Sequence, residues 1–366
     1  MSWRRPARIV GGLVAVALGA VALAAGAGIA VPHLTRGGMS ATTAWGTVAL
    51  LAGLALLAVG THTLAVRLRW WGRIPVTLAV LAATVVVLLS LGPAVAATTV
   101  PRASLHALTP THRGLAYEDV SVPTADGVRL SGWYLPATNG AGVVLLHGAG
   151  STRSAVLEHA TALNRRGYGV LLLDARGHGL SEGRAMDLGW WGEVDVPAAV
   201  TFLAAREEID DARIGVVGLS MGGEQAIGAL AVDPRIRVVV AEGATGRTAA
   251  DNAWYSDVYG FRGSLQERID GLRHRVVEEL TDAPAPSSLR KSAIAAAPRP
   301  VLLIVAGTVP DERYAAVHIR SGSPGTVSTW EVPGARHTGA LAAVGSQWRD
   351  RVIAFLEAAF DRPVSP

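Results

Sequence analysis

The sequence predicts an α/β domain built on a mostly parallel, doubly wound sheet, preceded by three membrane-spanning helices. Before residue 100, three long apolar runs follow one another in a stretch that contains no Lys, Asp or Glu. After residue 117, short β-branched segments alternate with segments of helical length, which is typical of a parallel sheet with crossover helices. The chain therefore divides near residue 100 into an apolar part and a globular part.

The charge follows the same division. Residues 1–100 contain seven arginines and no acidic residue, whereas the rest of the chain contains 26 basic and 29 acidic residues. The net charge of +4 thus comes from the flanks of the apolar runs, and we expect no nucleic-acid partner. The chain also has no Cys, which excludes a disulfide framework, a thiolate metal site and a cysteine nucleophile.

Each apolar run is long enough to span a bilayer as a helix. The runs cover residues 9–31, 44–66 and about 76–100, and none contains a charged side chain. About 20 apolar residues cross the roughly 30 Å hydrocarbon core of a membrane. A cleaved signal peptide is the alternative for the first run, because Arg4, Arg5 and Arg8 precede it, but the run is long for such a peptide.

The positions of the arginines predict the orientation of this anchor. Three arginines precede the first run, Arg36 lies in the first loop, and the second loop contains Arg67, Arg69 and Arg73. Because positively charged loops are retained in the cytoplasm, we expect a cytoplasmic N-terminus and a cytoplasmic second loop. A connector at residues 101–116 and the globular domain at 117–366 would then lie on the extracytoplasmic face of the cell membrane.

The globular part is expected to begin with an antiparallel hairpin at residues 117–122 and 128–135, around an Asp126-Gly127 turn. Buried strands are predicted at residues 143–147, 168–174, 213–218, 236–242, 300–306 and 326–332. Helices are expected near residues 153–166, 192–207, 221–231, 312–320 and 340–360. The stretch from about 243 to 298 interrupts this alternation and is predicted to be a helical lid insertion over the sheet.

A Gly-x-Ser-x-Gly motif spans residues 218–222, with Ser220 at its centre. It follows an apolar strand and precedes a helix, which is the context of a nucleophile elbow. The small flanking residues allow a tight turn that exposes the serine hydroxyl, and the helix N-terminus presents main-chain N–H groups to an anion. Ser220 is therefore the candidate nucleophile.

A His-Gly-Ala-Gly stretch at residues 147–150 ends an earlier strand. The N–H of Ala149, together with that of Met221, is expected to form an oxyanion hole. His147 is predicted to be structural, because a nucleophile elbow works with its partners in the chain order Ser, acid, His.

That order indicates His337 as the base, in a loop between the last strand and the last helix. His178 is the competing imidazole, but its loop follows an earlier strand and is assigned to the scaffold. The acid should follow the strand at 300–306, where Asp311 and Glu312 stand side by side. Asp311 is the favoured acid, and Glu312 and Glu242 are the alternatives.

Four motifs resemble those of the α/β-hydrolase superfamily, and its serine hydrolases most closely. They are Asp-Gly-Val-x-Leu-x-Gly-Trp-Tyr at 126–134, the His-Gly stretch at 147, Asp-x-Arg-Gly-His-Gly-x-Ser at 174–181 and Gly-x-Ser-Met-Gly-Gly at 218–223. The resemblance covers roughly residues 115–360. It implies an α/β-hydrolase fold and hydrolysis of an ester, thioester or amide by a Ser-acid-His triad, without a metal or organic cofactor. Many relatives place the acid one position earlier, where this chain has Pro310.

These observations predict a membrane-tethered serine hydrolase acting on a small-molecule acyl substrate, for which a lipid is one candidate. Alternatives are an acyltransferase or serine peptidase with the same triad, and a catalytically silent binding domain. Aromatic residues of the insertion are candidates for the substrate pocket or for packing of the lid: Trp254, Tyr255, Tyr259 and Phe261.

Overall fold

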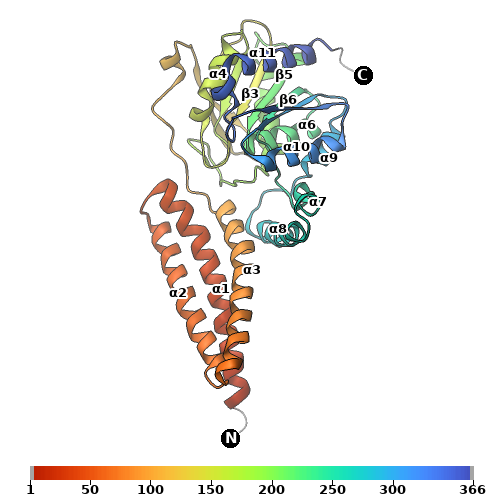
Figure 1. Ribbon diagram of the computed structural model, residues 1–366. Coiled ribbons are helices and arrows are strands. Elements are labelled where there is room, and N and C mark those ends of the chain that lie inside the picture. The colour runs from red at the N-terminus through yellow and green to blue at the C-terminus, as the bar shows by residue number, and fades with distance from the viewer. Residues whose placement is uncertain (1–3, 363–366) are drawn as a thin grey trace. The chain divides into compact units, whose positions relative to one another are not determined.

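The computed structural model describes residues 4–362 and divides into two compact units (Figure 1). The first contains the described residues up to Pro101 together with Ser264–Asp282. The second contains Arg102–Gly263 and the described residues from Ala283 onward.

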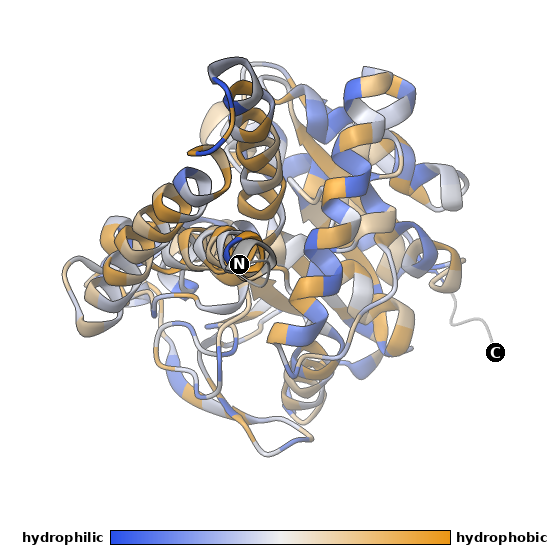
Figure 2. Ribbon diagram, turned by 90° about the horizontal axis from the view of Figure 1, so that it is seen from below, coloured by the Kyte–Doolittle hydropathy of each residue, from blue (hydrophilic) through white to orange (hydrophobic). Residues whose placement is uncertain are grey.

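Three helices make up most of the first unit: α1 (Arg4–Gly37), α2 (Ala41–Ala65) and α3 (Trp70–Thr98). All three are long and apolar enough to cross a membrane, and Figure 2 colours them predominantly as hydrophobic. α3 begins earlier than the sequence pattern predicts and includes Arg73. Its guanidinium donates hydrogen bonds to the carbonyls of Leu68 and Val66, 3.0 and 3.1 Å away, so the turn after α2 is closed by this side chain.

Glycines spaced seven residues apart line the contact between α1 and α2. A Cβ on Gly19 would lie 2.8 Å from the main-chain nitrogen of Leu57, and one on Gly60 would lie 2.9 Å from the carbonyl oxygen of Gly12. The two helices therefore approach each other backbone to backbone, as small residues allow in membrane helix pairs. The glycines that face the partner helix in this way are Gly12, Gly19 and Gly26 of α1 and Gly46, Gly53 and Gly60 of α2.

The second unit contains an eight-stranded sheet in the order β1-β2-β4-β3-β5-β6-β7-β8. β1 pairs antiparallel with β2, β2 pairs antiparallel with β4, and the remaining neighbours are parallel. The predicted entry hairpin and the buried parallel strands are therefore both present. The strands are β1 (Glu118–Pro123), β2 (Arg129–Leu135), β3 (Gly142–Leu146), β4 (Gly169–Leu173), β5 (Ile214–Leu219), β6 (Ile236–Glu242), β7 (Val301–Ala306) and β8 (Val327–Val332).

Helices cover both faces of the sheet (Figure 1). On one face, α5 (Gly192–Ala204), α6 (Met221–Val232), α9 (Leu289–Ala295) and α10 (Pro310–Gly322) contribute to one apolar core. On the other face, α4 (Leu157–Asn164) and α11 (Ala340–Phe360) enclose a second core around Trp348. Because both faces are covered, the central strands are continuous apolar runs.

The predicted insertion is helical, with α7 (Tyr255–Tyr259), α8 (Phe261–Leu280) and α9 in that order. Its last helix belongs to the body of the domain, since Leu289 and Ala293 are buried in the core beside the sheet. Four short 3₁₀ turns complete the secondary structure of the described residues: η1 (Pro110–Arg113), η2 (Arg153–Val156), η3 (Asp211–Arg213) and η4 (Ala249–Asn252).

Candidate active site

Ser220 lies in a sharp turn between β5 and α6. Its backbone has φ 52° and ψ −121°, a region that residues other than glycine rarely occupy. A Cβ on Gly218 would overlap the carbonyl of Gly222, and a Cβ on Gly222 would lie 2.6 Å from the carbonyl oxygen of Leu146. The motif glycines are therefore required by the close approach of three backbone segments, and this approach produces the elbow that the sequence predicts.

His337 follows β8 and contacts the serine. Its Nε2 lies 2.9 Å from Ser220 Oγ, and its Nδ1 lies 2.6 Å from Oε1 of Glu312. Glu312 is in the first turn of α10, is almost completely buried and also accepts a hydrogen bond of 2.7 Å from the main-chain N–H of Ala306. The hydrogen bond to Glu312 raises the pKa of His337, and partial burial of the imidazole opposes this shift.

The structure does not bring Asp311, the favoured acid of the sequence analysis, to His337. The Asp311 carboxylate accepts a hydrogen bond from the hydroxyl of Tyr259, and its side chain is exposed. Consecutive residues of a helix point about 100° apart, so only one of the two neighbouring carboxylates faces inward. α10 begins at Pro310, and this start directs the longer Glu312 side chain to the imidazole.

Glu242, the other alternative, holds the loop that carries His337. One carboxylate oxygen accepts a 2.8 Å hydrogen bond from the N–H of Ala340, and the other accepts a 3.1 Å hydrogen bond from Nε1 of Trp348. The carbonyl oxygen of Glu242 also accepts a 2.7 Å bond from the N–H of Ser220. Burial raises the pKa of the Glu242 carboxyl. This side chain thus links β6 to the start of α11.

The predicted oxyanion donors follow the ends of β3 and β5. A Cβ on Gly148 would lie 3.3 Å from Cβ of Ser220, so the main chain before Ala149 passes directly beside the serine. Met221 is the first residue of α6, where an N–H group has no partner within the helix. Both N–H groups are therefore in segments that border Ser220.

His147 and His178 are buried and lie edge to face, with ring centroids 5.3 Å apart. Nε2 of His147 accepts a 2.9 Å hydrogen bond from the N–H of Ala175, and burial lowers the pKa of His147 to about 3. His178 Nδ1 lies 3.0 Å from the carbonyl oxygen of Arg176. Both imidazoles have the structural environment that the sequence predicts.

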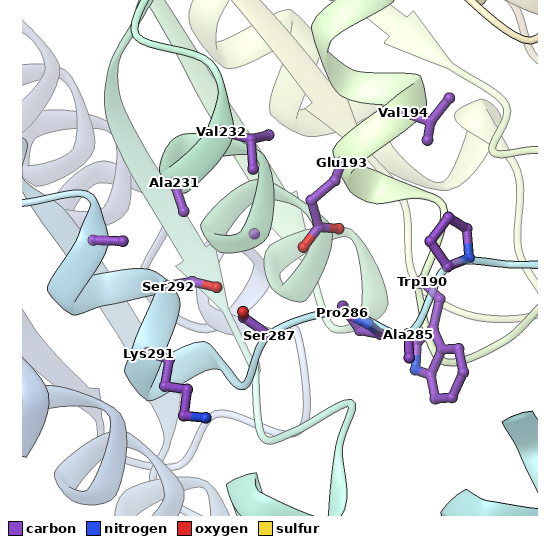
Figure 3. Close-up of a pocket in the computed structure, with 13 residues that line it drawn as sticks. Trp190, Glu193, Val194, Ala231, Val232, Ala285, Pro286, Ser287, Lys291 and Ser292 are labelled. Carbon is purple, nitrogen blue, oxygen red and sulfur yellow. The ribbon is translucent and has the colours of Figure 1, made fainter.

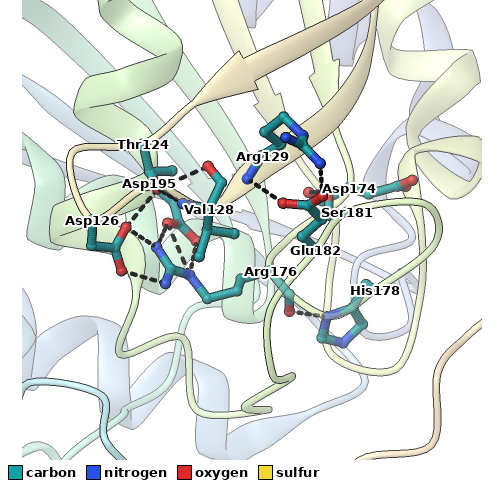
Figure 4. A network of polar contacts seen from close by, with 10 residues as sticks. All are labelled: Thr124, Asp126, Val128, Arg129, Asp174, Arg176, His178, Ser181, Glu182 and Asp195. Atoms are coloured by element: carbon teal, nitrogen blue, oxygen red, sulfur yellow. Dashed lines mark hydrogen bonds and ion pairs between the residues drawn. The ribbon is translucent and has the colours of Figure 1, made fainter.

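Arg176 organises the loop after β4 (Figure 4). Its guanidinium bonds to Asp126 in the β1–β2 turn at 2.5 Å and to Asp195 of α5 at 2.6 Å. It also stacks 4.0 Å over the ring of Trp191. Through Arg176, the motif at residues 174–181 therefore connects the β1–β2 hairpin, the loop after β4 and α5.

Aromatic residues gather beside α10. Trp254 contacts Tyr255, Tyr259 and also Tyr314, with ring centroids 4.4, 6.2 and 5.6 Å away. We refer to these four residues as the aromatic cluster. Phe261 is 86% exposed, and no ring contact joins it to the cluster among the described residues.

Sequence reasoning did not identify two residues of this region. Tyr314 lies one helical turn after Asp311, and this spacing is the signal that would have placed it in the cluster. Glu224, four residues after Ser220, is buried and accepts hydrogen bonds from the N–H groups of Gly246 and Thr245 at 2.9 and 3.2 Å. Burial raises the pKa of Glu224 to about 7.

A pocket of about 210 Å³ lies between α5, α6 and α9 (Figure 3). Its lining includes Trp190, Glu193 and Lys291, and it includes neither Ser220 nor His337. The Glu193 carboxylate is paired with the fully buried guanidinium of Arg247 at 2.5 Å. The acidic group of this pocket is thus already neutralised within the fold.

The geometry at Glu242 yields a testable expectation. The substitution Glu242→Gln leaves one carbonyl oxygen to accept from two N–H donors. One donor therefore loses its acceptor and faces the NH2 group of the amide. We expect the free energy of unfolding to fall by about 1–3 kcal/mol. Urea denaturation of this variant beside Glu331→Gln, whose side chain is exposed on β8, measures the difference. Equal stability of the two variants would contradict the role of Glu242 as a link.

Comparison with known proteins agrees with this architecture. Residues 137–285 match the family model described as serine aminopeptidase, S33. The chain is 38% identical over 128 residues to an uncharacterized protein of Mycobacterium tuberculosis, covering 34% of this chain and 45% of that protein. It is 34% identical over 142 residues to thiohydrolase aneE of Aspergillus aculeatus, covering 36% of this chain and 43% of that protein. The chain thus spans less than half the length of these curated relatives.

Among solved structures, the chain is similar to an esterase of Pyrococcus furiosus. The TM-score is 0.55 at 26% identity, over 71% of this chain and 97% of the esterase. The sheet order, the elbow at Ser220 and these similarities lead to one conclusion. The chain has the α/β-hydrolase fold.

Proposed function

We propose that the chain is a membrane-tethered serine hydrolase that cleaves carboxylic esters or thioesters through an acyl-enzyme on Ser220. One observation carries the proposal. The hydroxyl of Ser220, the imidazole of His337 and the carboxylate of Glu312 form a continuous line of hydrogen bonds at a partly exposed elbow. This arrangement meets the geometric requirement for an activated nucleophile.

In the first half of the reaction, His337 Nε2 accepts the proton of Ser220 as Oγ attacks the acyl carbon. Glu312 holds the Nδ1–H tautomer and stabilises the imidazolium that forms. The N–H groups of Met221 and Ala149 bind the developing oxyanion. The tetrahedral intermediate then collapses, and His337 returns the proton to the leaving alcohol or thiol.

In the second half, a water molecule replaces the leaving group. His337 removes a proton from this water as its oxygen attacks the acyl carbon, and the second tetrahedral intermediate releases the carboxylic acid and restores Ser220. The triad is Ser220, His337 and Glu312, with Asp311 outside it.

The aromatic cluster is the proposed wall for the acyl group. It is connected to the α10 end of the site, because Tyr259 donates its hydroxyl hydrogen to Asp311, the neighbour of Glu312. Large aromatic faces together with a few polar groups are typical of small-molecule pockets. The similarity to a thiohydrolase supports thioesters as substrates beside esters. The match to the serine aminopeptidase model makes amide cleavage the second candidate.

The proposed tether consists of α1, α2 and α3, whose length and composition suit a membrane. The arginines at residues 67, 69 and 73 favour a cytoplasmic second loop, and the single Arg36 favours an extracytoplasmic first loop. The hydrolase domain would then act on the extracytoplasmic side.

The first test removes the nucleophile. Ser220→Ala should reduce kcat for a p-nitrophenyl ester by about a millionfold and abolish labelling by a fluorophosphonate probe. The side chain is small and partly exposed, so the thermal melt should stay near that of the parent protein. Labelling that persists in this variant would refute Ser220 as the nucleophile.

A second test separates the two neighbouring carboxylates. Because the pKa of His337 is raised, and because only the neutral imidazole accepts the serine proton, kcat/KM should fall as the pH drops through a value above about 6.5. Glu312→Gln removes the main cause of the raised pKa, so the midpoint should move to lower pH. The same variant should lower kcat by roughly ten-thousandfold.

Asp311→Asn is the matched control, with the adjacent carboxylate altered in the same way. We expect its pH profile and kcat to stay close to those of the parent protein. The reverse result, with Asp311→Asn shifting the profile and Glu312→Gln leaving it unchanged, would return the acid to Asp311.

The third test concerns orientation and uses the absence of Cys from the chain. Single cysteines are introduced at two exposed positions, Leu68 in the second loop and Ala116 before β1. A membrane-impermeant maleimide added to intact cells should label Ala116→Cys and should label Leu68→Cys only after the membrane is permeabilised. The opposite pattern would invert the proposed topology.

A further inference from the structure

A second, larger pocket lies between α4 and the first part of α11. Its volume of about 660 Å³ is within the range of about 300–1,000 Å³ that is usual for small-molecule sites. One wall comes from η2, α4 and the turn after α4, and the other comes from Thr338 and the first three turns of α11. Neither Ser220 nor His337 lines this pocket.

The rim of this pocket is basic. Arg165, Arg166 and Arg349 line it, and the acidic lining residue Glu158 is bonded to Arg113 at 2.6 Å. Arg166 contacts Asp350 at 3.4 Å, with both side chains largely exposed. Within residues 4–362, the structure gives the guanidinium groups of Arg165 and Arg349 no hydrogen bond or ion pair. The pocket therefore presents uncompensated positive charge.

A buried imidazole also lines this pocket. His159 is only 6% exposed, lines the pocket, and neither of its ring nitrogens has a hydrogen-bond partner among the described residues. Burial lowers the pKa of His159 to about 4, so the ring is neutral. Both ring nitrogens are themselves buried, so a ligand in the pocket contacts this side chain by van der Waals packing.

The remainder of the lining is largely apolar. Ala155, Ala162, Leu341 and Ala342 contribute short hydrocarbon surfaces between the two walls. Guanidinium groups favour carboxylate and phosphate oxygens, and the alanines and leucine favour a hydrocarbon body. The matching ligand is an anion with an attached apolar chain.

Contacts connect this pocket to the triad. Thr338 directly follows His337 and has a left-handed backbone, with φ 53°. The ring of His159 packs edge-on against Trp348 with centroids 5.1 Å apart, and Trp348 donates to Glu242. α11 has a non-helical residue at Val344, between the two parts of the helix that line the pocket.

We propose that this pocket is a binding site for an amphiphilic anion with a carboxylate or phosphate head group, and that its occupation fixes the loop carrying His337. Binding of such an anion does not depend on the proposed function. The effect of binding on turnover rests on the proposed function. A ligand in this pocket contacts Thr338, which directly follows His337. It also contacts His159, which packs against Trp348, and Trp348 donates a hydrogen bond to Glu242. Its binding energy restricts the motion of the loop, and the hydrogen bond between His337 and Ser220 becomes more populated.

The binding experiment uses the full chain carrying Ser220→Ala, in nanodiscs of zwitterionic lipid, with octanoate and octyl phosphate as probes. Calorimetry should detect binding of at least one of these anions and none of octanol, which has the same chain without the charge. The two anions distinguish a carboxylate head group from a phosphate head group. If octanol binds as tightly as the anions, the proposed role of the arginines is overturned.

The double substitution Arg165→Gln/Arg349→Gln should raise the dissociation constant at least tenfold. Arg290→Gln/Arg320→Gln is the matched control, because it removes two exposed arginines outside the pocket and changes the net charge equally. The control should bind like the parent. A thermal melt verifies folding of both variants, and Arg165→Lys/Arg349→Lys, which keeps the charge, should retain most of the affinity. Equal affinity in the two glutamine variants would refute the site.

The link to His337 is measured on the active protein with p-nitrophenyl acetate. Saturating probe should raise kcat about two- to fivefold in the parent and in the Arg290→Gln/Arg320→Gln control, and should have no effect in Arg165→Gln/Arg349→Gln. Binding without any change in kcat would refute the link. A probe that raises only KM, equally in all variants, occupies the substrate site and would overturn the proposal. Complete inactivity of the parent protein would instead refute the proposed function, while calorimetry still tests the pocket.

Discussion

At Ser220 the chain reverses from β5 into α6 with a left-handed backbone, and three main-chain segments meet within van der Waals contact around it. Only glycine at 218 and 222 permits this approach. The unfavourable conformation is maintained by the surrounding hydrogen bonds, including the bond from the Ser220 N–H to the carbonyl of Glu242. The position of the Ser220 hydroxyl depends on this turn, and so do its contacts with the neighbouring groups.

Glu242 connects this turn to the start of α11, which follows the loop that carries His337. Its carbonyl fixes the serine backbone, and its carboxylate fixes Ala340 and Trp348 at the start of α11. Two segments more than a hundred residues apart in sequence are therefore set by one residue at the end of β6. The charge of this buried carboxylate, with that of Glu312, also favours the protonated form of His337. The same residue thus serves both geometry and electrostatics.

The sequence pattern predicts the sheet well, because the central strands are buried on both faces and the crossover helices have clear boundaries. Glycine spacing and strand order also predict that Ser220 and His337 lie together, and their side chains are within hydrogen-bonding distance in the structure. The choice between Asp311 and Glu312 could not be made in this way. It depends on the residue at which α10 begins, and a shift of one position rotates the side chain by about 100°.

The same limit applies to the contacts made by Glu242 and Tyr314. Glu242 is recognisable as a carboxylate at a strand end, but its partners Ala340 and Trp348 lie about a hundred residues away and leave no local signal. Tyr314 is separated from the other aromatic residues of its cluster by the whole of α8, α9 and β7. Long-range packing decides these pairs, and no short sequence window contains that information.

The order of the strands has a consequence for biosynthesis. Ser220 follows β5, Glu312 follows β7 and His337 follows β8, and β8 lies at the end of the described sheet, beside β7. During translation α1, α2 and α3 emerge before the sheet, and His337 emerges more than a hundred residues after Ser220. A nascent chain therefore has a complete elbow long before it contains His337, and the hydrogen bond between Ser220 and His337 forms only after α11 has left the ribosome and packed onto the sheet.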